Sequence, residues 1–369
     1  MKKKLSIVII IVAVLMVAAI VALRNYRVNS VDDVCNVGII LPLTGPLEYE
    51  GKRLLAAIQY AQTVKANAPL QLACHIEDGK YTVKDSINAF YRLMTQNNID
   101  VWIIYGDLPL MGLKDMLKST EKPVVCMIGA QELIKGLDTF IHFSGSIVSP
   151  ARKVAEYANI NSIQTASMIY HKEQIGDIVA AEFRKRFELQ GGRILAEESF
   201  VDEYTDVKTL ISKAISRQPD ALFVYAYGPS YISILNQIKA QGFKGAVLTD
   251  SNVSTVRDKI VNGGDGILYA DFDFGLGCYN PETLEFIDVM RRDYGVDASS
   301  FSAFMYEAVR VLSNVVNDFG KSPNNVVKGF DSVINYPSIV GTLTYVPDGE
   351  LMVPIVMKRI TGNNVEVIK

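Results

Sequence analysis

The sequence is poor in the residues from which most catalytic and metal sites are built. It holds three histidines, His75, His142 and His171, and none is spaced with another as a metal ligand. The patterns GxxxxGKS, GxxxxGKT, HExxH and GxSxG are all missing. The run GGDG at 263–266 is typical of a turn, because no strand and no fingerprint acid accompany it as in a dinucleotide-binding loop. We therefore expect no catalytic residue, no metal and no cofactor, although missing motifs do not by themselves exclude an enzyme.

Cysteine is also scarce and follows no ligand pattern. The four cysteines stand at positions 35, 74, 126 and 278, without a CxxC pair. Cys35, Cys74 and Cys126 each fall in an apolar, strand-like run, which predicts buried thiols. A location outside the cytoplasm would permit a disulfide, and the sequence leaves any pairing open.

The chain has no excess of positive charge. It carries 37 Lys and Arg against 40 Asp and Glu, a formal net charge of −3. Residues 1–27 hold five of the basic groups and no acid, so the remainder has 32 basic and 40 acidic groups, a balance of −8. This acidic body argues against nucleic acid or an anionic membrane surface as the main partner. A length of 369 residues with 49% hydrophobic side chains indicates a globular chain of two domains.

The first 30 residues are typical of a signal or anchor segment. Three lysines precede an uninterrupted apolar run from Leu5 to Leu23. This run is longer than the ~7–15 residues of a cleaved signal peptide and is close to the ~20 of a spanning helix. It favours an uncleaved helix that anchors the protein to the membrane, with a cleaved leader as the alternative. The lysines favour a cytoplasmic N-terminus, which places the body on the periplasmic or extracellular face of the cytoplasmic membrane.

Beyond residue 30, short runs rich in Val, Ile and aromatics alternate with segments of helical period. This alternation predicts an α/β protein with parallel sheets, and so many units suit two doubly wound, Rossmann-like domains. The end of the chain differs, with hairpin turns expected at 347–349 and 362–364. The expected strands are 34–42, 70–77, 101–105, 123–128, 165–170, 193–200, 221–226 and 245–249.

Apolar stripes mark the helices between these strands. Spacings of three and four residues put each stripe on one helix face. The stripes are Val83, Ile87, Phe90 and Met94, then Val207, Leu210, Ile211 and Ala214, then Met305, Val309, Leu312 and Val316.

Ligands of open parallel sheets bind beyond the carboxyl ends of the strands. The loops after the strands are therefore the candidate binding segments. They read LTGPLEYEG, EDGKYT, GDLPL with Asp107, GAQEL, HKEQIG, YGPSY and DSNVS.

Seven segments in order resemble type I periplasmic substrate-binding proteins of the leucine/isoleucine/valine-binding group. VGIILPLTGPLEYEGKRLLAAIQYA is similar to the N-terminal strand, PLTGP turn and first helix of that family. PVVCMIGAQEL and PDALFVYAYGPSYISILNQIKAQGF follow the family's later strands and loops. EDGKYTVKDSINAFYRLMTQNNIDVWIIYG, ASMIYHKEQIGDIVAAEFRKRFELQGGRI and two segments of the last third keep the order. The resemblance covers residues 34–369.

The resemblance implies two lobes joined by three crossing strands that close around a ligand. Lobe 1 would comprise 31–143 plus 275–346, and lobe 2 would comprise 144–274 plus 347–369. The crossings would fall near Ile141–Gly145, Tyr269–Phe274 and Val346–Pro354. The membrane subunits of an ABC transporter would be the downstream partner.

The family's binding positions carry over unevenly to this chain. Its carboxylate-binding positions match Leu110, Ala130 and Gln131, of which Ala130 alone keeps its type. A position that the family fills with an aromatic residue matches Glu50, beside Tyr49. The remaining matches are Ile175, Tyr227, Ser251 with its neighbour Asp250, and Phe301.

Structural roles compete for several of these positions. Tyr227 could pack against the hinge, Asp250 could cap a helix at 251–254, and Gln131 and Glu132 could cap the short helix after the fourth strand. If Glu48 and Glu50 face the cleft, the ligand would be cationic or polar rather than a branched aliphatic amino acid.

Three functions compete on this evidence. The first is an extracytoplasmic solute-binding protein that holds a small polar ligand, such as an amino acid, without covalent chemistry. The second is an envelope-anchored regulatory protein on the same fold, without a transported solute, which a cleft filled by bulky side chains would support. The third is an enzyme on a flavodoxin-like fold, which no set of catalytic residues in the sequence supports.

Overall fold

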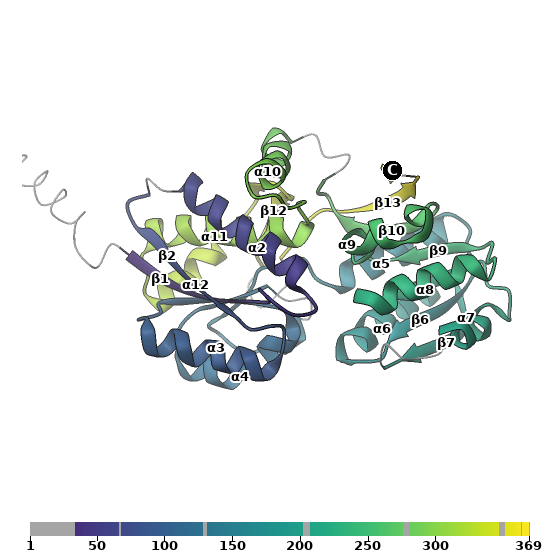
Figure 1. Ribbon diagram of the computed structural model, residues 1–369, viewed down its shortest axis with the longest axis horizontal. Helices are drawn as coiled ribbons and strands as arrows, with labels where there is room; N and C mark the ends of the chain where they lie inside the picture. Colours follow the sequence, from purple (N-terminus) through teal and green to yellow (C-terminus); the bar gives the residue numbers. More distant parts are fainter. Residues whose placement is uncertain are drawn as a thin grey trace, which may run out of the picture.

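In the computed structural model the chain forms two helix-covered β-sheets that lie side by side along the long axis of the molecule (Figure 1). The structure describes residues 34–65, 68–127, 131–201, 207–275, 280–346, 351–362 and 364–368. No helix in this described part combines the length and the apolar character that a membrane span requires. The expected anchor, 1–30, lies outside the described residues, as do Cys278 and the turn at 347–349.

The first sheet, with its helices, is called lobe 1. Its five strands are all parallel and run in the order β2-β1-β3-β4-β5. Helices α3 and α4 cover one face, and α2, α11 and α12 cover the other (Figure 1). The strands are β1 (Val34–Leu41), β2 (Gln71–Asp78), β3 (Val101–Tyr105), β4 (Val124–Met127) and β5 (Phe140–His142). The helices are α2 (Glu48–Val64), α3 (Val83–Gln96), α4 (Asp107–Ser119), α10 (Pro281–Arg292), α11 (Ser300–Phe319) and α12 (Pro323–Asp331).

Alternate residues of β1 enter different cores, which explains why nearly all of its residues are apolar. Ile39 packs in the core under α2 and α11, whereas Ile40 joins Trp102 and Ile104 under α3 and α4. A parallel strand covered on both faces needs apolar side chains at every position. Cys35 and Cys126 are buried here and Cys74 is partly buried, and all three are free thiols, as predicted.

The predicted face of α3 is confirmed at its centre, where Phe90 is buried and Ile87 packs against the core, and is wrong at its two ends. Val83 and Met94 are 38% and 44% exposed. The ring of Phe90 stacks on Trp102 at 4.9 Å, and the inward face continues through Ala89 and Leu93. The buried residues are Ser86, Ala89, Phe90 and Leu93.

The second sheet, with its helices, is called lobe 2. Its seven strands run in the order β14-β13-β10-β9-β8-β6-β7, and β13 and β14 are the antiparallel members. The strands are β6 (Thr165–His171), β7 (Arg193–Phe200), β8 (Ala221–Tyr225), β9 (Ala246–Thr249), β10 (Leu268–Phe272), β13 (Ile355–Thr361) and β14 (Asn364–Ile368). The helices are α5 (Val148–Ile160), α6 (Gln174–Leu189), α7 (Val207–Ile215), α8 (Gly228–Ala240) and α9 (Val253–Val256). The α/β fold with parallel sheets is confirmed, and so is the last hairpin, in which Thr361 pairs with Asn364.

The chain passes between the sheets after β5, after β10 and before β13. Two of these passages touch, because Gly145 forms a parallel bridge with Leu351. The ring of Phe272 fills the space beside Gly145, where an added Cβ would come within 1.8 Å of it. Glycine at 145 therefore lets all three passages pack closely. Between the second and third passages the chain also forms a small hairpin, β11 (Tyr336–Ser338) with β12 (Gly341–Leu343).

A buried ion pair holds the passage after β10. Lys358 of β13 places its Nζ 3.1 Å from a carboxylate oxygen of Asp271. The same ammonium donates to the carbonyl oxygens of Phe272 and Phe274, at 3.2 and 2.8 Å. Lys358 and Asp271 are only 3% and 4% exposed. The ammonium thus ties the departing chain to the edge of lobe 2.

Candidate functional site

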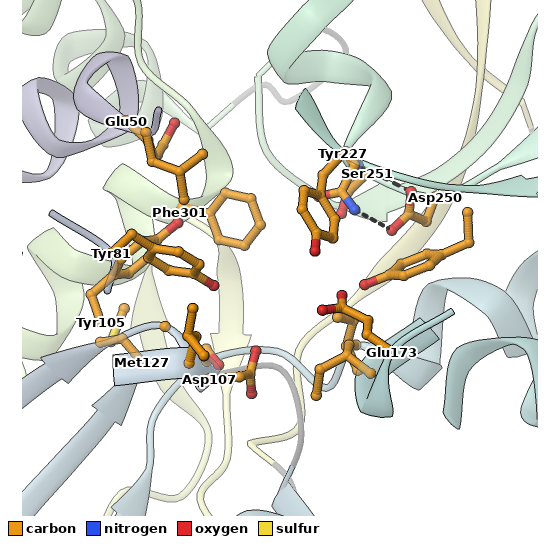
Figure 2. Close-up of a pocket in the computed structure, with 18 of the residues that line it drawn as sticks. Glu50, Tyr81, Tyr105, Asp107, Met127, Glu173, Tyr227, Asp250, Ser251 and Phe301 are labelled. Carbon is orange, nitrogen blue, oxygen red and sulfur yellow. Dashed lines mark hydrogen bonds between the residues drawn. The ribbon is translucent and has the colours of Figure 1, made fainter. Parts of the chain in front are cut away.

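The carboxyl ends of strands from both sheets open onto one cavity of about 320 Å³ between the lobes. Figure 2 shows the two walls facing each other across this cleft. The residues from lobe 1 and its passages are Leu47, Tyr49, Glu50, Tyr81, Tyr105, Gly106, Asp107, Leu108, Met111, Met127, Ser144 and Phe301. Those from lobe 2 are Ile147, Pro150, Glu173, Gln174, Ile175, Tyr225, Tyr227, Asp250, Ser251, Asn252 and Phe272.

The turn after β1 is held by one carboxylate. Asp78, at the end of β2, accepts hydrogen bonds from the backbone N–H groups of Leu43 and Thr44 at 3.0 and 3.3 Å. It also accepts from the Thr44 hydroxyl at 2.5 Å and from the Lys80 N–H at 2.9 Å. Gly45 then turns the chain at φ 89°, a conformation that glycine adopts readily, and α2 starts beside the cleft. The loop EDGK is therefore a brace for the PLTGP turn rather than a metal site.

Replacing Asp78 with Ala should lower the free energy of unfolding by about 1–3 kcal/mol, because three backbone donors lose a charged acceptor. Burial raises the pKa of Asp78, but the hydrogen bonds from Thr44, Lys80 and Leu43 outweigh it and leave the pKa lowered. This stabilisation is complete above the unfolded value of about 3.9 and is lost as the pH falls below it. Urea denaturation at neutral pH and at about pH 3 measures both effects. Equal stabilities of Asp78→Ala and the parent at neutral pH would show that the brace is not needed.

Glu50 lines the cleft, but its carboxylate is already bound within lobe 1. Ser299 donates to it at 2.6 Å, and the Arg53 guanidinium lies 3.2 Å away. Burial raises the pKa of Glu50, while Arg53 and Ser299 oppose the rise. Glu48 pairs with Lys52 at 2.6 Å and does not line the cleft. The inference of a cationic ligand from Glu48 and Glu50 therefore loses its basis in these two residues.

Aromatic rings form the wall of lobe 1. Tyr81 lies against Tyr105 with ring centroids 6.5 Å apart, and Tyr105 meets Phe301 edge to face at 6.3 Å. Figure 2 shows the three side chains on the same side of the cleft. The close approach requires Gly106, since a Cβ there would come within 2.3 Å of the Tyr81 ring. Phe301 was expected at the site, whereas Tyr81 and Tyr105 were not named individually. Tyr81 lies in the EDGKYT loop and Tyr105 ends β3, so their positions at strand ends were the available signal.

Tyrosines and acids form the opposite wall, on lobe 2. Tyr227 is 40% exposed, and its hydroxyl lies 3.5 Å from Nδ1 of His171. Burial raises the pKa of Tyr227, and Glu173 adds to the rise through its charge and a hydrogen bond. Glu173 precedes α6 and was not expected at the site, although it lies in the HKEQIG loop. The wall also includes Ile175 and Ser251, which were expected.

Asp250 lies at the base of this wall and is 2% exposed. Its carboxylate accepts from the backbone N–H of Asn252 at 3.3 Å and from the Asn252 side-chain amide at 3.0 Å. Helix α9 starts at Val253 with Asn252 as its N-cap, so the Asp250 carboxylate binds the turn that leads into α9 and not the helix itself. Burial raises the pKa of Asp250 to about 8, despite the Asn252 hydrogen bond. At neutral pH Asp250 is therefore mostly protonated, and it ionises as the pH rises towards about 8.

Two expected positions do not reach the cleft, and a third cannot be placed. Leu110 is fully buried in the core, and its N–H donates to the carbonyl of Gly106 within α4. Gln131 begins the short helix η3 (Gln131–Leu133) and does not line the cavity. Ala130 lies outside the described residues. The Leu110 N–H is used in the hydrogen bonding of α4 and is not available to a ligand carboxylate. The resemblance in sequence does not reveal this.

In the described part of the chain, no group of three or more His, Cys, Asp or Glu side chains is arranged to hold a metal ion. The cleft instead combines aromatic rings, aliphatic side chains and carboxylates drawn from both lobes. Such a surface can bind a small organic molecule through burial and polar contacts.

Comparison with known proteins gives matches over most of the chain. Residues 35–363 match the family model described as periplasmic binding protein. A leucine-binding protein from Thermotoga maritima has 17% identity and a TM-score of 0.82, with 91% of this chain and 98% of that chain covered. A branched-chain amino acid binding protein from Streptococcus pneumoniae, in complex with isoleucine, has 17% identity and a TM-score of 0.80 over 91% and 99%. A solute-binding protein from Rhodopseudomonas palustris, in complex with 3,4-dihydroxybenzoic acid, has 15% identity and a TM-score of 0.80 over 89% and 94%.

Proposed function

Because the chain belongs to the periplasmic binding protein family, we propose that it is the solute-binding protein of an ABC transporter and holds a small ligand between its lobes. The family consists of extracytoplasmic, non-enzymatic binding proteins. The observation that carries the proposal is the cavity of about 320 Å³, which is lined from both lobes at their strand ends. Closure of the lobes would surround a ligand with contacts from two sides.

The hinge of this closure would be the three passages between the sheets. Their positions support lobe boundaries near 143, 274 and 346, so that lobe 1 comprises 31–143 plus 275–346. Ligand contacts are proposed for the expected residues that line the cavity: Tyr49, Glu50, Asp107, Ile175, Tyr227, Asp250, Ser251 and Phe301.

The alternative is a regulatory protein on the same fold that binds no transported solute. That function would be favoured by a cleft filled with bulky side chains. The cavity between the lobes is open instead, although aromatic residues line it. Solute binding is therefore the better supported function.

For location, the proposal is a body outside the cytoplasmic membrane, tethered by residues 1–30. The support is the apolar run from Leu5 to Leu23, preceded by three lysines. N-terminal sequencing of the native protein tests the tether, because a mature start between Arg24 and Asp32 would show a cleaved leader instead.

Binding can be measured by thermal unfolding of the full chain in the presence of separate solutes. The set comprises leucine, isoleucine, benzoate, choline and phenyltrimethylammonium. At a concentration of about 100 times Kd, a ligand that binds only the folded state stabilises it by about 2.7 kcal/mol. The bound protein should also become more compact in small-angle X-ray scattering. A folded protein that none of a wide range of small solutes stabilises would overturn the proposed function.

A further inference from the structure

The charged side chains that line the cleft are all acidic. Among the described lining residues there are four acids and no lysine, arginine or histidine. Arg53 and Lys259 approach the rim over the Tyr49 ring, at 5.6 and 6.0 Å, but neither lines the cavity. Arg53 is already paired with Glu50. The other lining acids are Asp107, Glu173 and Asp250, and the Glu173 carboxylate also lies 3.6 Å from Nδ1 of His171, which is outside the lining.

Two of these acids occupy the positions where an anionic ligand would bind best. Asp107 is the first residue of α4, and Glu173 is the residue before α6. Helix N-termini attract negative charge, so each carboxylate is favoured there and a ligand anion would have to compete with it. This arrangement disfavours a carboxylate ligand at these two helix ends.

The aromatic rings that line the cleft also suit a cationic ligand. Tyr81, Tyr105 and Phe301 line one wall, while Tyr225 and Tyr227 line the other beside Glu173 and Asp250. The faces of such rings attract ammonium groups, and alkylated ammonium loses little hydration when it is buried there. Burial raises the pKa of Tyr225, and the charges of Asp250, Asp107 and Glu173 raise it further, so all three carboxylates act on one ring.

We propose that the cleft selects a small organic cation, an amine or quaternary ammonium group held between the aromatic wall of lobe 1 and the carboxylates of lobe 2. This inference rests on the proposed solute-binding function and names its ligand class. The proposed ligand differs from the amino-acid and aromatic-acid ligands of the structural neighbours. The carboxyl groups of Glu173, Asp250 and Asp107 favour a positive charge in this cleft (Figure 2).

The test is calorimetric titration of the full chain with matched probes. Choline and phenyltrimethylammonium are the cations, and 3,3-dimethyl-1-butanol is the uncharged isostere of choline. Leucine and benzoate represent the zwitterion and the anion. We expect at least one cation to bind, with the uncharged isostere about tenfold weaker or more, since it lacks the charge that rings and carboxylates attract.

Variants of the lining acids test whether the cation binds in the cleft. Glu173→Gln should weaken cation binding by about tenfold, because it removes one charge and keeps the shape, and Asp250→Asn should do the same above about pH 8, where Asp250 is ionised. Glu48→Gln, an exposed acid outside the lining, is the control and should leave the affinity unchanged. Affinity for a quaternary ammonium should rise as the pH increases towards about 8, where buried Asp250 ionises, and Asp250→Asn should remove that rise.

The outcomes separate the two proposals. Binding of leucine or benzoate with no cation bound overturns the cation inference and leaves the solute-binding function standing. A cation that binds equally well to the parent, Glu173→Gln and Asp250→Asn also overturns it. Failure of every solute with a folded protein overturns both.

Discussion

Replacing Lys358 with Ala is expected to destabilise the protein by about 3–5 kcal/mol, because it leaves the Asp271 carboxylate buried without its partner. Burial already raises the pKa of Asp271, and the Lys358 ammonium opposes that rise. The variant also deprives the carbonyls of Phe272 and Phe274 of a donor. Urea denaturation measures the loss in the free energy of unfolding. We expect lobe 2 and the passage after β10 to be destabilised together.

The pH dependence of the stability of Lys358→Ala tests whether the buried Asp271 carboxylate causes the destabilisation. Without the ammonium, the folded-state pKa of Asp271 rises further above its unfolded value, so the folded state binds a proton that the unfolded chain does not. Stability of the variant should therefore recover, relative to the parent, as the pH falls towards about 4. The double variant Lys358→Met with Asp271→Asn removes both charges and should recover more than half of the loss. A double variant as unstable as Lys358→Ala would mean that the buried charge is not the reason.

Replacing Gly51 with Ala is the second change with a large expected effect. A Cβ at this position would come within 2.0 Å of the carbonyl oxygen of Pro42, which is backbone and cannot rotate away. Helix α2 would have to retreat from the turn after β1, carrying Tyr49 and Glu50 away from the cleft. We expect a loss of about 1–3 kcal/mol in the free energy of unfolding and weaker binding of any cleft ligand.

Gly112→Ala is the matched control, since Gly112 is also a helical glycine. Its added Cβ would meet the side chain of Val83, with Cγ1 at 2.6 Å and Cβ at 3.2 Å, and Val83 is the 38% exposed first residue of α3. Alanine also favours a helix by about 1 kcal/mol over glycine, so this variant should lose less stability than Gly51→Ala. If thermal unfolding shows the same loss for both glycines, contact with the Pro42 backbone is not what matters at Gly51.

The strands of both sheets follow closely from the sequence. Expected strands at 101–105 and 193–200 coincide with β3 and β7, and the other six differ by one residue at one or both ends. Runs of apolar residues at every position specify strands that are buried on both faces. The α3 helix shows the limit of the same reasoning, because Val83 and Met94 satisfy the helical spacing and are still exposed. Spacing predicts that a face exists, while the packing of Ala89, Phe90 and Leu93 against the sheet decides where it lies.

The candidate site was predicted as a set of loops and only partly as residues. Tyr227 and Asp250 lie on the cleft, as strand-end loops should, and Phe301 lines it from the first turn of α11. Leu110 does not, because its side chain fills the core and its N–H is used within α4. Glu173, Tyr81 and Tyr105 were in or beside the expected loops but carried no mark that distinguished them from solvent-facing residues.

By itself the sequence determined that this chain is an α/β protein of two doubly wound lobes, with binding loops at the strand ends and a turn built from Pro42, Gly45 and Pro46. The tertiary structure alone decided the charge of the cleft. Glu50, the conspicuous acid of LPLTGPLEYEG, is bound by Arg53 and Ser299, a residue far along the chain. Asp107, Glu173 and Asp250 come from separate loops and meet only when the lobes are placed opposite each other. The physical reason is that pairing between charges depends on distances in space, which local sequence patterns do not contain.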